Sequence, residues 1–328
     1  MSHSPPPSVL HVLWSDIMAD VLRESSVPGE TVVWRDMGAY APTPADDETL
    51  ARMQGEMLVA DGFFETVDGA LQARRSGEER LARACDHDEV VLWFDPCLYD
   101  HVILVQRLTA FAAMDAQHVR FSVVCVRENL GHNTPSELAG LFPDREPVRT
   151  AQFELAVRAW QAYRSPDPEA LSELLAGDTS ALPGLAAAFT DHLERYPSTR
   201  DGLGAVDRAV LEHASRLGRT RLSRLIGSSL ADLMYLSDTL AERHAREMTF
   251  CRHPMLRLHD GPEWPVRYAG DIEITPQGRA VLAGDADFVA LNGIDRWLGG
   301  VHLMGAEAQW RWDPEQRRLV ASSPPPPG

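Results

Sequence analysis

Three short apolar runs in the first hundred residues each end in a tryptophan, one further residue and an aspartate. These runs are Val12-Leu13-Trp14-Ser15-Asp16, Val32-Val33-Trp34-Arg35-Asp36 and Val91-Leu92-Trp93-Phe94-Asp95. A short, continuous apolar run is typical of a strand that is buried on both faces, as in a parallel sheet. Parallel strands end at one edge of the sheet, where open α/β folds bind their ligands. The pattern therefore predicts a small polar or anionic ligand at that edge.

Strands and helices alternate through the front part of the chain. We predict strands over 9–14, 30–34, 89–94 and 119–126, helices over 16–24 and 98–113, and a helical stretch over 46–84 that its glycines break. This alternation predicts an α/β fold with a doubly wound, mostly parallel sheet.

The remainder of the chain is mostly helical. Helical spacing of apolar residues is found over 134–141, 151–163, 168–175, 184–194, 205–214, 220–226 and 230–244, and short strands over 256–258 and 271–274. Three helices followed by two strands and the step Ile274-Thr275-Pro276 predict a winged-helix-like C-terminal domain. We therefore expect disordered ends (1–8 and 321–328), a Rossmann-like domain (9–148), a helical linker region (149–197) and the winged-helix-like domain (198–320).

The charges of the chain exclude several functions. The 328 residues carry a net charge of −17 and contain no lysine, which removes a Schiff base to pyridoxal phosphate, a lysine nucleophile and a P-loop lysine. Up to Pro197 there are 15 arginines against 31 acidic residues, and from Ser198 onward 16 against 17. The acidic front part therefore disfavours nucleic acid as its partner, whereas the rear part leaves nucleic acid or a protein partner open.

Membrane and secretory signals are missing from the sequence. It has no apolar run long enough to span a bilayer, and its start lacks the basic region of a signal peptide. The four cysteines are scattered without a disulfide or metal-binding pattern. We expect a reduced, cytoplasmic protein with no membrane partner.

Asp16, Asp95 and His101 are the candidate catalytic residues. The two aspartates follow neighbouring strands, and carboxylates there could hold a divalent metal or act as general base. His101, in the first turn of the following helix, could serve as a base or metal ligand. The alternative is structural, because aspartate is a favoured N-cap where a strand turns into a helix.

Further polar residues at the same edge are candidates for ligand binding. Arg35 would hold an anionic group of the substrate. Asp36, Tyr99, Asp100 and Glu128 would complete the site, and Cys97 at the helix start is either a nucleophile or a buried apolar residue.

Several motifs resemble the uncharacterised bacterial family called domain of unknown function 1835. They include Pro28-Gly29-Glu30, Ser198-Thr199-Arg200-Asp201-Gly202-Leu203 and the long block from Val289 to Leu303, followed by Trp310-Arg311-Trp312-Asp313. Typical members carry His-Glu-Gly-Pro after the second strand and Glu-His-Asp after the third. Here these positions read Ala39-Tyr40-Ala41-Pro42 and Asp95-Pro96-Cys97, so the resemblance implies a divergent member with a lost or rebuilt site.

Two classes of function follow from these observations. The first is a hydrolase or transferase that acts at the Asp16/Asp95 edge, with a divalent metal as a candidate cofactor. The alternative is a regulator or interaction protein with an α/β sensor domain and a winged helix that docks DNA or protein, or a degenerate partner of an active family member.

Overall fold

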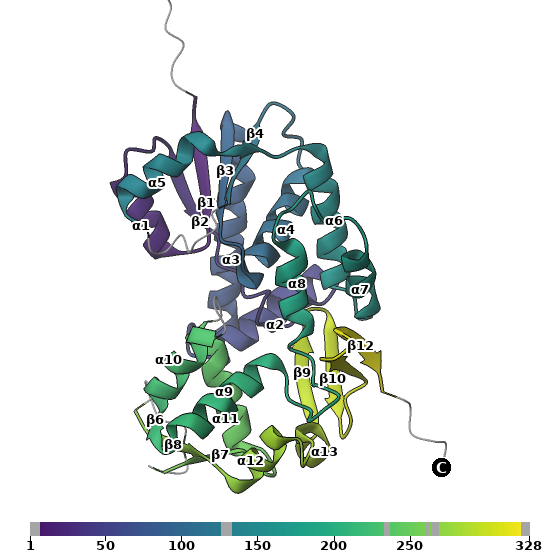
Figure 1. The fold of residues 1–328 in the computed structure, drawn as a ribbon. Helices are drawn as coiled ribbons and strands as arrows, with labels where there is room; N and C mark the ends of the chain where they lie inside the picture. Colours follow the sequence, from purple (N-terminus) through teal and green to yellow (C-terminus); the bar gives the residue numbers. More distant parts are fainter. Residues whose placement is uncertain (1–6, 126–132, 233–236, 260–262, 264–268, 323–328) are drawn as a thin grey trace, which may run out of the picture. The chain divides into compact units, whose positions relative to one another are not determined.

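The computed structural model describes all residues except 1–6, 126–132, 233–236, 260–262, 264–268 and 323–328 (Figure 1). The chain forms two compact units. The first unit comprises 1–166 and 173–188, and the second comprises 167–172 and 189–328. Helices α7 (Glu169–Ala176) and α8 (Leu185–Leu193) lie in the region where the chain passes between the units. The domain boundaries expected from the sequence stay a prediction.

The first unit is built on a five-stranded sheet. Its strands are β1 (Val9–Leu13), β2 (Glu30–Val33), β3 (Glu89–Phe94), β4 (Arg120–Cys125) and β5 (Glu146–Pro147), in the order β2-β1-β3-β4-β5. The first four are parallel, and Val12 lies opposite Val32 on one side and Leu92 on the other. Only the two-residue β5 at the border is antiparallel. The predicted doubly wound, mostly parallel α/β sheet is confirmed.

Helices cover both faces of this sheet. They are α1 (Asp16–Glu24), α2 (Asp47–Ala60), α3 (Val67–Ala82), α4 (Leu98–Ala112), α5 (Pro135–Leu141) and α6 (Thr150–Tyr163). Figure 1 shows α1 and α5 on one side of the sheet and α4 and α6 on the other. Met18 and Leu22 of α1 pack with Leu138 of α5 onto strand residues such as Leu13 and Trp93.

The second unit begins with three helices and a small antiparallel sheet. In chain order they are α9 (Ala205–Leu217), β6 (Thr220–Arg221), α10 (Leu222–Asp232), α11 (Asp238–Phe250), β7 (Leu256–Leu258) and β8 (Asp271–Ile274), followed by α12 (Pro276–Ala283) and α13 (Phe288–Asn292). The strand order is β6-β8-β7. One apolar core, whose fully buried members include Val210, Leu225 and Met248, joins these helices to the strands.

Two hairpins complete the second unit. They are β9 (Ile294–Leu298) with β10 (Val301–Gly305), and β11 (Trp310–Asp313) with β12 (Arg318–Ala321). A buried network attaches the first hairpin to the helices, because Asp207 of α9 accepts hydrogen bonds from Arg296 of β9 at 2.7 Å and pairs with His244 of α11 at 2.6 Å. Among the described residues, no helix is long and apolar enough to cross a bilayer.

Some predicted element bounds are confirmed and others are wrong. The strand over 89–94 and the helix over 16–24 have the predicted ends. The single helix predicted over 230–244 is wrong, because Ser237 caps a new helix by accepting a hydrogen bond from the Leu240 N–H at 3.2 Å. The helix predicted over 220–226 is also wrong at its start, where Thr220 and Arg221 pair with β8 as a third strand.

Candidate functional site

The strand order places a topological switch point between β1 and β3. The chain leaves β1 for β2 on one side and then returns past β1 to β3 on the other. Asp16 and Asp95 follow these two neighbouring parallel strands, so the main chain brings both to the carboxyl edge, as the sequence predicts. What their side chains do there depends on the direction in which each points.

Asp16 is engaged in a surface ion pair. Its carboxylate accepts a hydrogen bond from Nε of Arg35 at 3.1 Å and from Nη2 at 2.5 Å. The side chains of Asp16 and Arg35 are 59% and 69% exposed. An ion pair this exposed contributes about 0–1 kcal/mol to stability. Arg35, the candidate for an anionic substrate group, is therefore matched by a carboxylate of the chain itself.

Asp36 points away from that pair, into the layer of helices α3 and α4. It accepts hydrogen bonds from the Gly38 N–H at 2.6 Å, from Gln106 at 2.9 Å and from Arg74 at 3.1 Å. The side chain of Asp36 is fully buried. Since successive side chains of an extended segment alternate in direction, Arg35 and Asp36 face opposite ways. Asp36 holds an arginine in place here, and its carboxylate is not open to the sheet edge.

Asp95, Cys97 and Asp100 form the buried start of α4. Oδ2 of Asp100 accepts a hydrogen bond from the Asp95 N–H at 2.5 Å, and Sγ of Cys97 accepts one from the Asp100 N–H at 3.4 Å. Burial and the charge of Asp95 raise the pKa of Asp100 well above its usual range. Burial and the charge of Asp100 likewise raise the pKa of Cys97. The thiol is therefore protonated at neutral pH and acts as a helix cap, not as a nucleophile.

His101 and Tyr99 are held by their neighbours. Both ring nitrogens of the buried His101 face main-chain carbonyls, Nδ1 that of Cys97 at 2.9 Å and Nε2 that of Pro183 at 3.1 Å. The ring of Tyr99 stacks on Tyr40, with 5.2 Å between the ring centroids. Both side chains are thus engaged by other residues of the first unit.

The predicted site residues thus fall into separate groups. Asp16 pairs with Arg35 and Asp36 with Arg74, whereas the main-chain N–H of Asp95 donates to the carboxylate of Asp100. Glu128 lies outside the described residues. Among the described residues, no group of three or more His, Cys, Asp or Glu could hold a metal ion.

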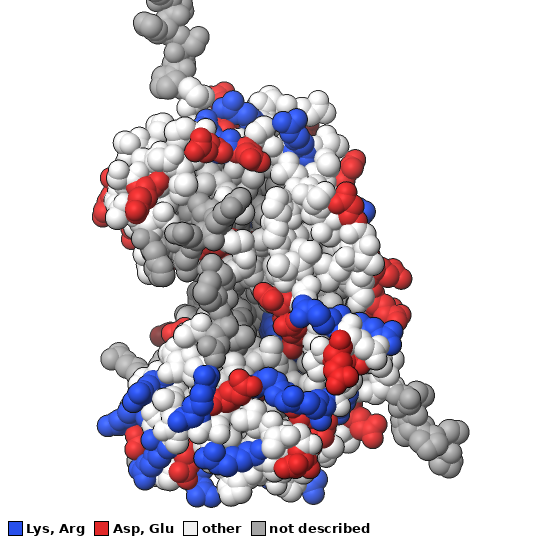
Figure 2. Space-filling view, in the orientation of Figure 1, with Lys and Arg blue, Asp and Glu red and all other residues white. Residues whose placement is uncertain are grey.

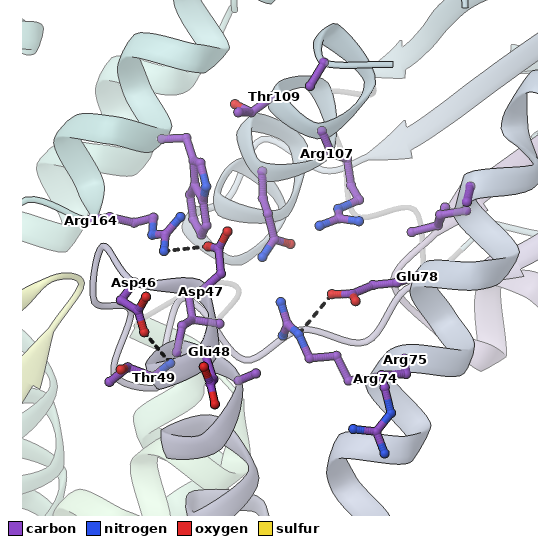
Figure 3. A pocket seen from close by; sticks show the side chains of 18 of the residues that line it. Asp46, Asp47, Glu48, Thr49, Arg74, Arg75, Glu78, Arg107, Thr109 and Arg164 are labelled. Atoms are coloured by element: carbon purple, nitrogen blue, oxygen red, sulfur yellow. Dashed lines mark hydrogen bonds and ion pairs between the residues drawn. The ribbon is translucent and has the colours of Figure 1, made fainter. Parts of the chain in front are cut away.

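A large pocket lies elsewhere in the first unit, among helices α2, α3, α4 and α6. Its volume is about 1120 Å³. Arginines come to it from three of these elements and the residue after α6, and we name it the arginine pocket (Figure 3). The members used below are Arg74, Glu78, Arg107, Asp47, Arg164 and the apolar side chains of Leu71, Phe111, Met114 and Trp160.

Arg107 of α4 is the unusual member of the arginine pocket. It is only 7% exposed, and its guanidinium carbon lies 3.9 Å from the ring centroid of Trp34. Among the described residues, Nε of Arg107 has no hydrogen-bond partner and the guanidinium forms no ion pair. Burial lowers the pKa of Arg107 to about 10, so the group is still charged at neutral pH.

The charges of the other two arginines are matched by nearby acidic residues. Arg74 bonds Asp36 at 3.1 Å and Glu78 at 3.2 Å. Arg164 bonds Asp47 at 2.7 Å on the opposite wall, as Figure 3 shows. Of these three arginines, Arg107 is the one without a direct ion pair to a described residue.

We did not predict this pocket from the sequence, although one signal is present. Gln106 and Arg107 interrupt the helix Leu98–Ala112, which is otherwise apolar and buried from Val102 to Leu108. A charged residue on the buried face of an apolar helix requires a partner.

No protein-family model and no curated protein matches this chain, so membership of the family called domain of unknown function 1835 stays a prediction.

Proposed function

We propose that the first unit binds a small anionic molecule in the arginine pocket, with Arg107 as its principal contact. The observation that carries this proposal is the buried, charged guanidinium of Arg107, which has no ion pair among the described residues. A buried charge without a partner costs several kcal/mol, about 3 or more by comparison with broken buried pairs. An anion that forms charge-assisted hydrogen bonds to Arg107 would remove much of this cost.

The arrangement around Arg107 supports a preformed site. The Trp34 ring lies against the guanidinium, and the indole N–H of Trp34 donates to Gln106 at 2.9 Å. Gln106 in turn donates to Asp36, which also bonds Arg74. This chain of contacts fixes both arginines before a ligand arrives, which reduces the entropy lost on binding.

The contacts at the sheet edge favour binding over catalysis. A general base or nucleophile needs a group that is free to reach the substrate. Asp16 is matched by Arg35, Cys97 is protonated, and both nitrogens of His101 face carbonyls. These observations support a regulator, which is the alternative function predicted from the sequence, more than a hydrolase or transferase that works through these side chains.

The test is a thermal-shift and calorimetric screen with inorganic phosphate, sugar phosphates, acetate and larger organic carboxylates. At least one anion should raise the unfolding temperature of the full chain, because ligands that bind only the native state stabilise it. Arg107→Met should weaken that binding at least about tenfold, the value of a hydrogen bond to a charged group.

Arg83→Met is the matched control. Arg83 carries the same charge in the same unit, but it is 69% exposed and pairs only with Asp86 among the described residues. This variant should bind the anion as the wild type does. If no anion binds, or if both variants lose binding equally, the proposal is wrong.

A second candidate function concerns the second unit, which we propose to be a winged-helix-like module that docks a protein and not DNA. The element order α9-β6-α10-α11-β7-β8 and the strand order β6-β8-β7 support the winged-helix reading. The charges oppose DNA, since Arg219 and Arg221 both pair with Asp271. Over α10 and α11, Figure 2 shows basic side chains interspersed with acidic ones.

Fluorescence anisotropy with a labelled duplex of mixed sequence tests this second proposal. At low salt we expect no saturable binding, because a mixed surface releases few counterions from DNA. Saturable binding that falls steeply as salt is added would show that DNA is a partner.

A further inference from the structure

We propose that the ligand of the arginine pocket is a monocarboxylate with an apolar body, such as a medium-chain fatty acid. This inference rests on the proposed anion site and specifies which anion the site accepts. Three features of the pocket lead to it: the charge balance, the orientation of the free guanidinium edge and the apolar wall.

The charge balance favours a single negative charge. The lining carries five arginines against four acidic residues, an excess of one positive charge: Arg52, Arg74, Arg75, Arg107 and Arg164 against Asp46, Asp47, Glu48 and Glu78. Asp46, Asp47 and Glu48 of the α2 start line the cavity together. A phosphate dianion or a polyphosphate would bring more negative charge than Arg107 neutralises and would be repelled by these acidic residues.

The guanidinium of Arg107 favours a planar group. Its N–H groups lie in the plane of the guanidinium, and Trp34 lies against one face of that plane. Nε is itself buried and has no hydrogen-bond partner among the described residues, so the Nη edge is the part that a ligand would reach. Two parallel hydrogen bonds from this edge fit the two oxygens of a carboxylate.

The rest of the wall favours an apolar body. The same cavity as Arg107 is lined by Phe111 from the last turn of α4, Met114 just after that helix, Leu71 from α3 and Trp160 from α6. The volume of about 1120 Å³ far exceeds the space that a carboxylate alone would fill. Ligand sites typically combine such an apolar lining with a few polar groups that fix the orientation of the ligand.

A series of ligands with matched parts tests the inference on the full chain by calorimetry. Octanoate has both the head and the body, acetate has only the head, octan-1-ol has only the body, and octyl phosphate has the body with a dianionic head. We expect octanoate to bind at least tenfold more tightly than each of the other three. Arg107→Met should reduce octanoate binding to the level of octan-1-ol.

Two further variants examine the apolar wall. Met114→Gln should weaken octanoate binding by about tenfold and leave acetate binding unchanged, because a half-buried methionine that contacts only the ligand body is replaced by a polar side chain. Met304→Gln, at an exposed position in the second unit, is the control and should bind octanoate normally.

The outcomes separate this inference from the proposed function. If phosphates bind in a way that depends on Arg107 and octanoate does not, the anion site stands and the monocarboxylate assignment is wrong. If octan-1-ol binds as tightly as octanoate, and Arg107→Met changes neither, then Arg107 does not hold an anion and both proposals are wrong.

Discussion

The guanidinium of Arg107 lies over the indole ring of Trp34, with 3.9 Å between the guanidinium carbon and the ring centroid. A cation over an aromatic ring gains about 2 kcal/mol when both groups are removed from water. That gain is smaller than the several kcal/mol lost when a charge is buried, about 3 or more by comparison with broken buried pairs. Trp34 therefore reduces the cost of burying Arg107 without removing it.

Arg107→Met should stabilise the protein when no ligand is present. Methionine fills a similar space, can still contact Trp34 and carries no charge. We therefore expect the free energy of unfolding to rise by about 1 kcal/mol. In a unit of this size, that change raises the unfolding temperature by about 2–4 °C. Thermal unfolding followed by circular dichroism measures the change in unfolding temperature. A lower unfolding temperature for the variant would show that Arg107 stabilises the folded protein.

Asp36→Asn should destabilise the first unit strongly. The substitution leaves the side chain of Arg74, which is only 19% exposed, without its buried carboxylate. Removing one partner of a buried pair costs about 3–5 kcal/mol, and the partial exposure of Arg74 places our expectation near the lower figure. Urea denaturation gives the change.

Asp16→Asn is the matched control for that experiment. It removes the same charge from an ion pair that is more than half exposed, so the free energy of unfolding should fall by less than about 1 kcal/mol. Equal losses for the two variants would contradict the assignment of Asp36 as the buried anchor.

His11 should make the stability of the first unit depend on pH. Nδ1 of this ring accepts a hydrogen bond from the Trp93 indole N–H at 3.1 Å, so Nε2 carries the proton that is donated to the Pro28 carbonyl. Burial lowers the pKa of His11 below its ordinary value of 6.5. The unfolded chain therefore takes up a proton at a higher pH than the folded chain does. The contribution of neutral His11 to stability is complete above pH 6.5 and is lost as the pH falls from there through the lowered pKa of the folded state.

Urea denaturation between pH 5 and 8, conditions that bracket the histidine pKa of about 6.5, checks this expectation. The slope of stability against pH below 6.5 should be smaller in His11→Gln than in the wild type, by up to about 1.4 kcal/mol per pH unit. His118→Gln, at a surface histidine, should keep the wild-type slope. Identical slopes in all three proteins would show that His11 is not held neutral.

Cys97 should resist alkylation in the native protein. Burial raises the pKa of both thiols, but Cys97 is a buried residue and Cys125 is exposed. Iodoacetamide followed by peptide mass spectrometry should find Cys125 modified before Cys97, and both modified in urea. Rapid labelling of native Cys97 would restore the possibility of a nucleophilic thiol.

The main-chain arrangement was open to prediction because it follows from continuous apolar runs. The runs that end at Trp14, Trp34 and Trp93 are strands of one parallel sheet, and Asp16 and Asp95 follow neighbouring strands. Side-chain direction was harder to predict, because it depends on long-range partners. Asp36 turns toward Arg74, 38 residues away, and Gln106, 70 residues away.

The arginine pocket could not be predicted from the local sequence pattern either, because it too depends on long-range contacts. Its walls come from separate helices, and the chemical meaning of Arg107 depends on which acidic residues reach its neighbours Arg74 and Arg164. The break between α10 and α11 was missed differently, because the Ser237 cap competes with apolar spacing that continues across it. The hydrogen bond of the Ser237 cap determines where α11 begins, and the apolar spacing does not.

The short antiparallel strand β5 limits how far the sheet can grow. Pro147 has no amide hydrogen to offer, and the strand is only two residues long, so its outer side is a poor template for another chain. At the opposite border, the guanidinium of Arg80 donates to the main-chain carbonyl of Thr31. Both borders thus discourage strand-by-strand stacking through this sheet, and we expect the first unit to resist fibril formation even when the protein is concentrated.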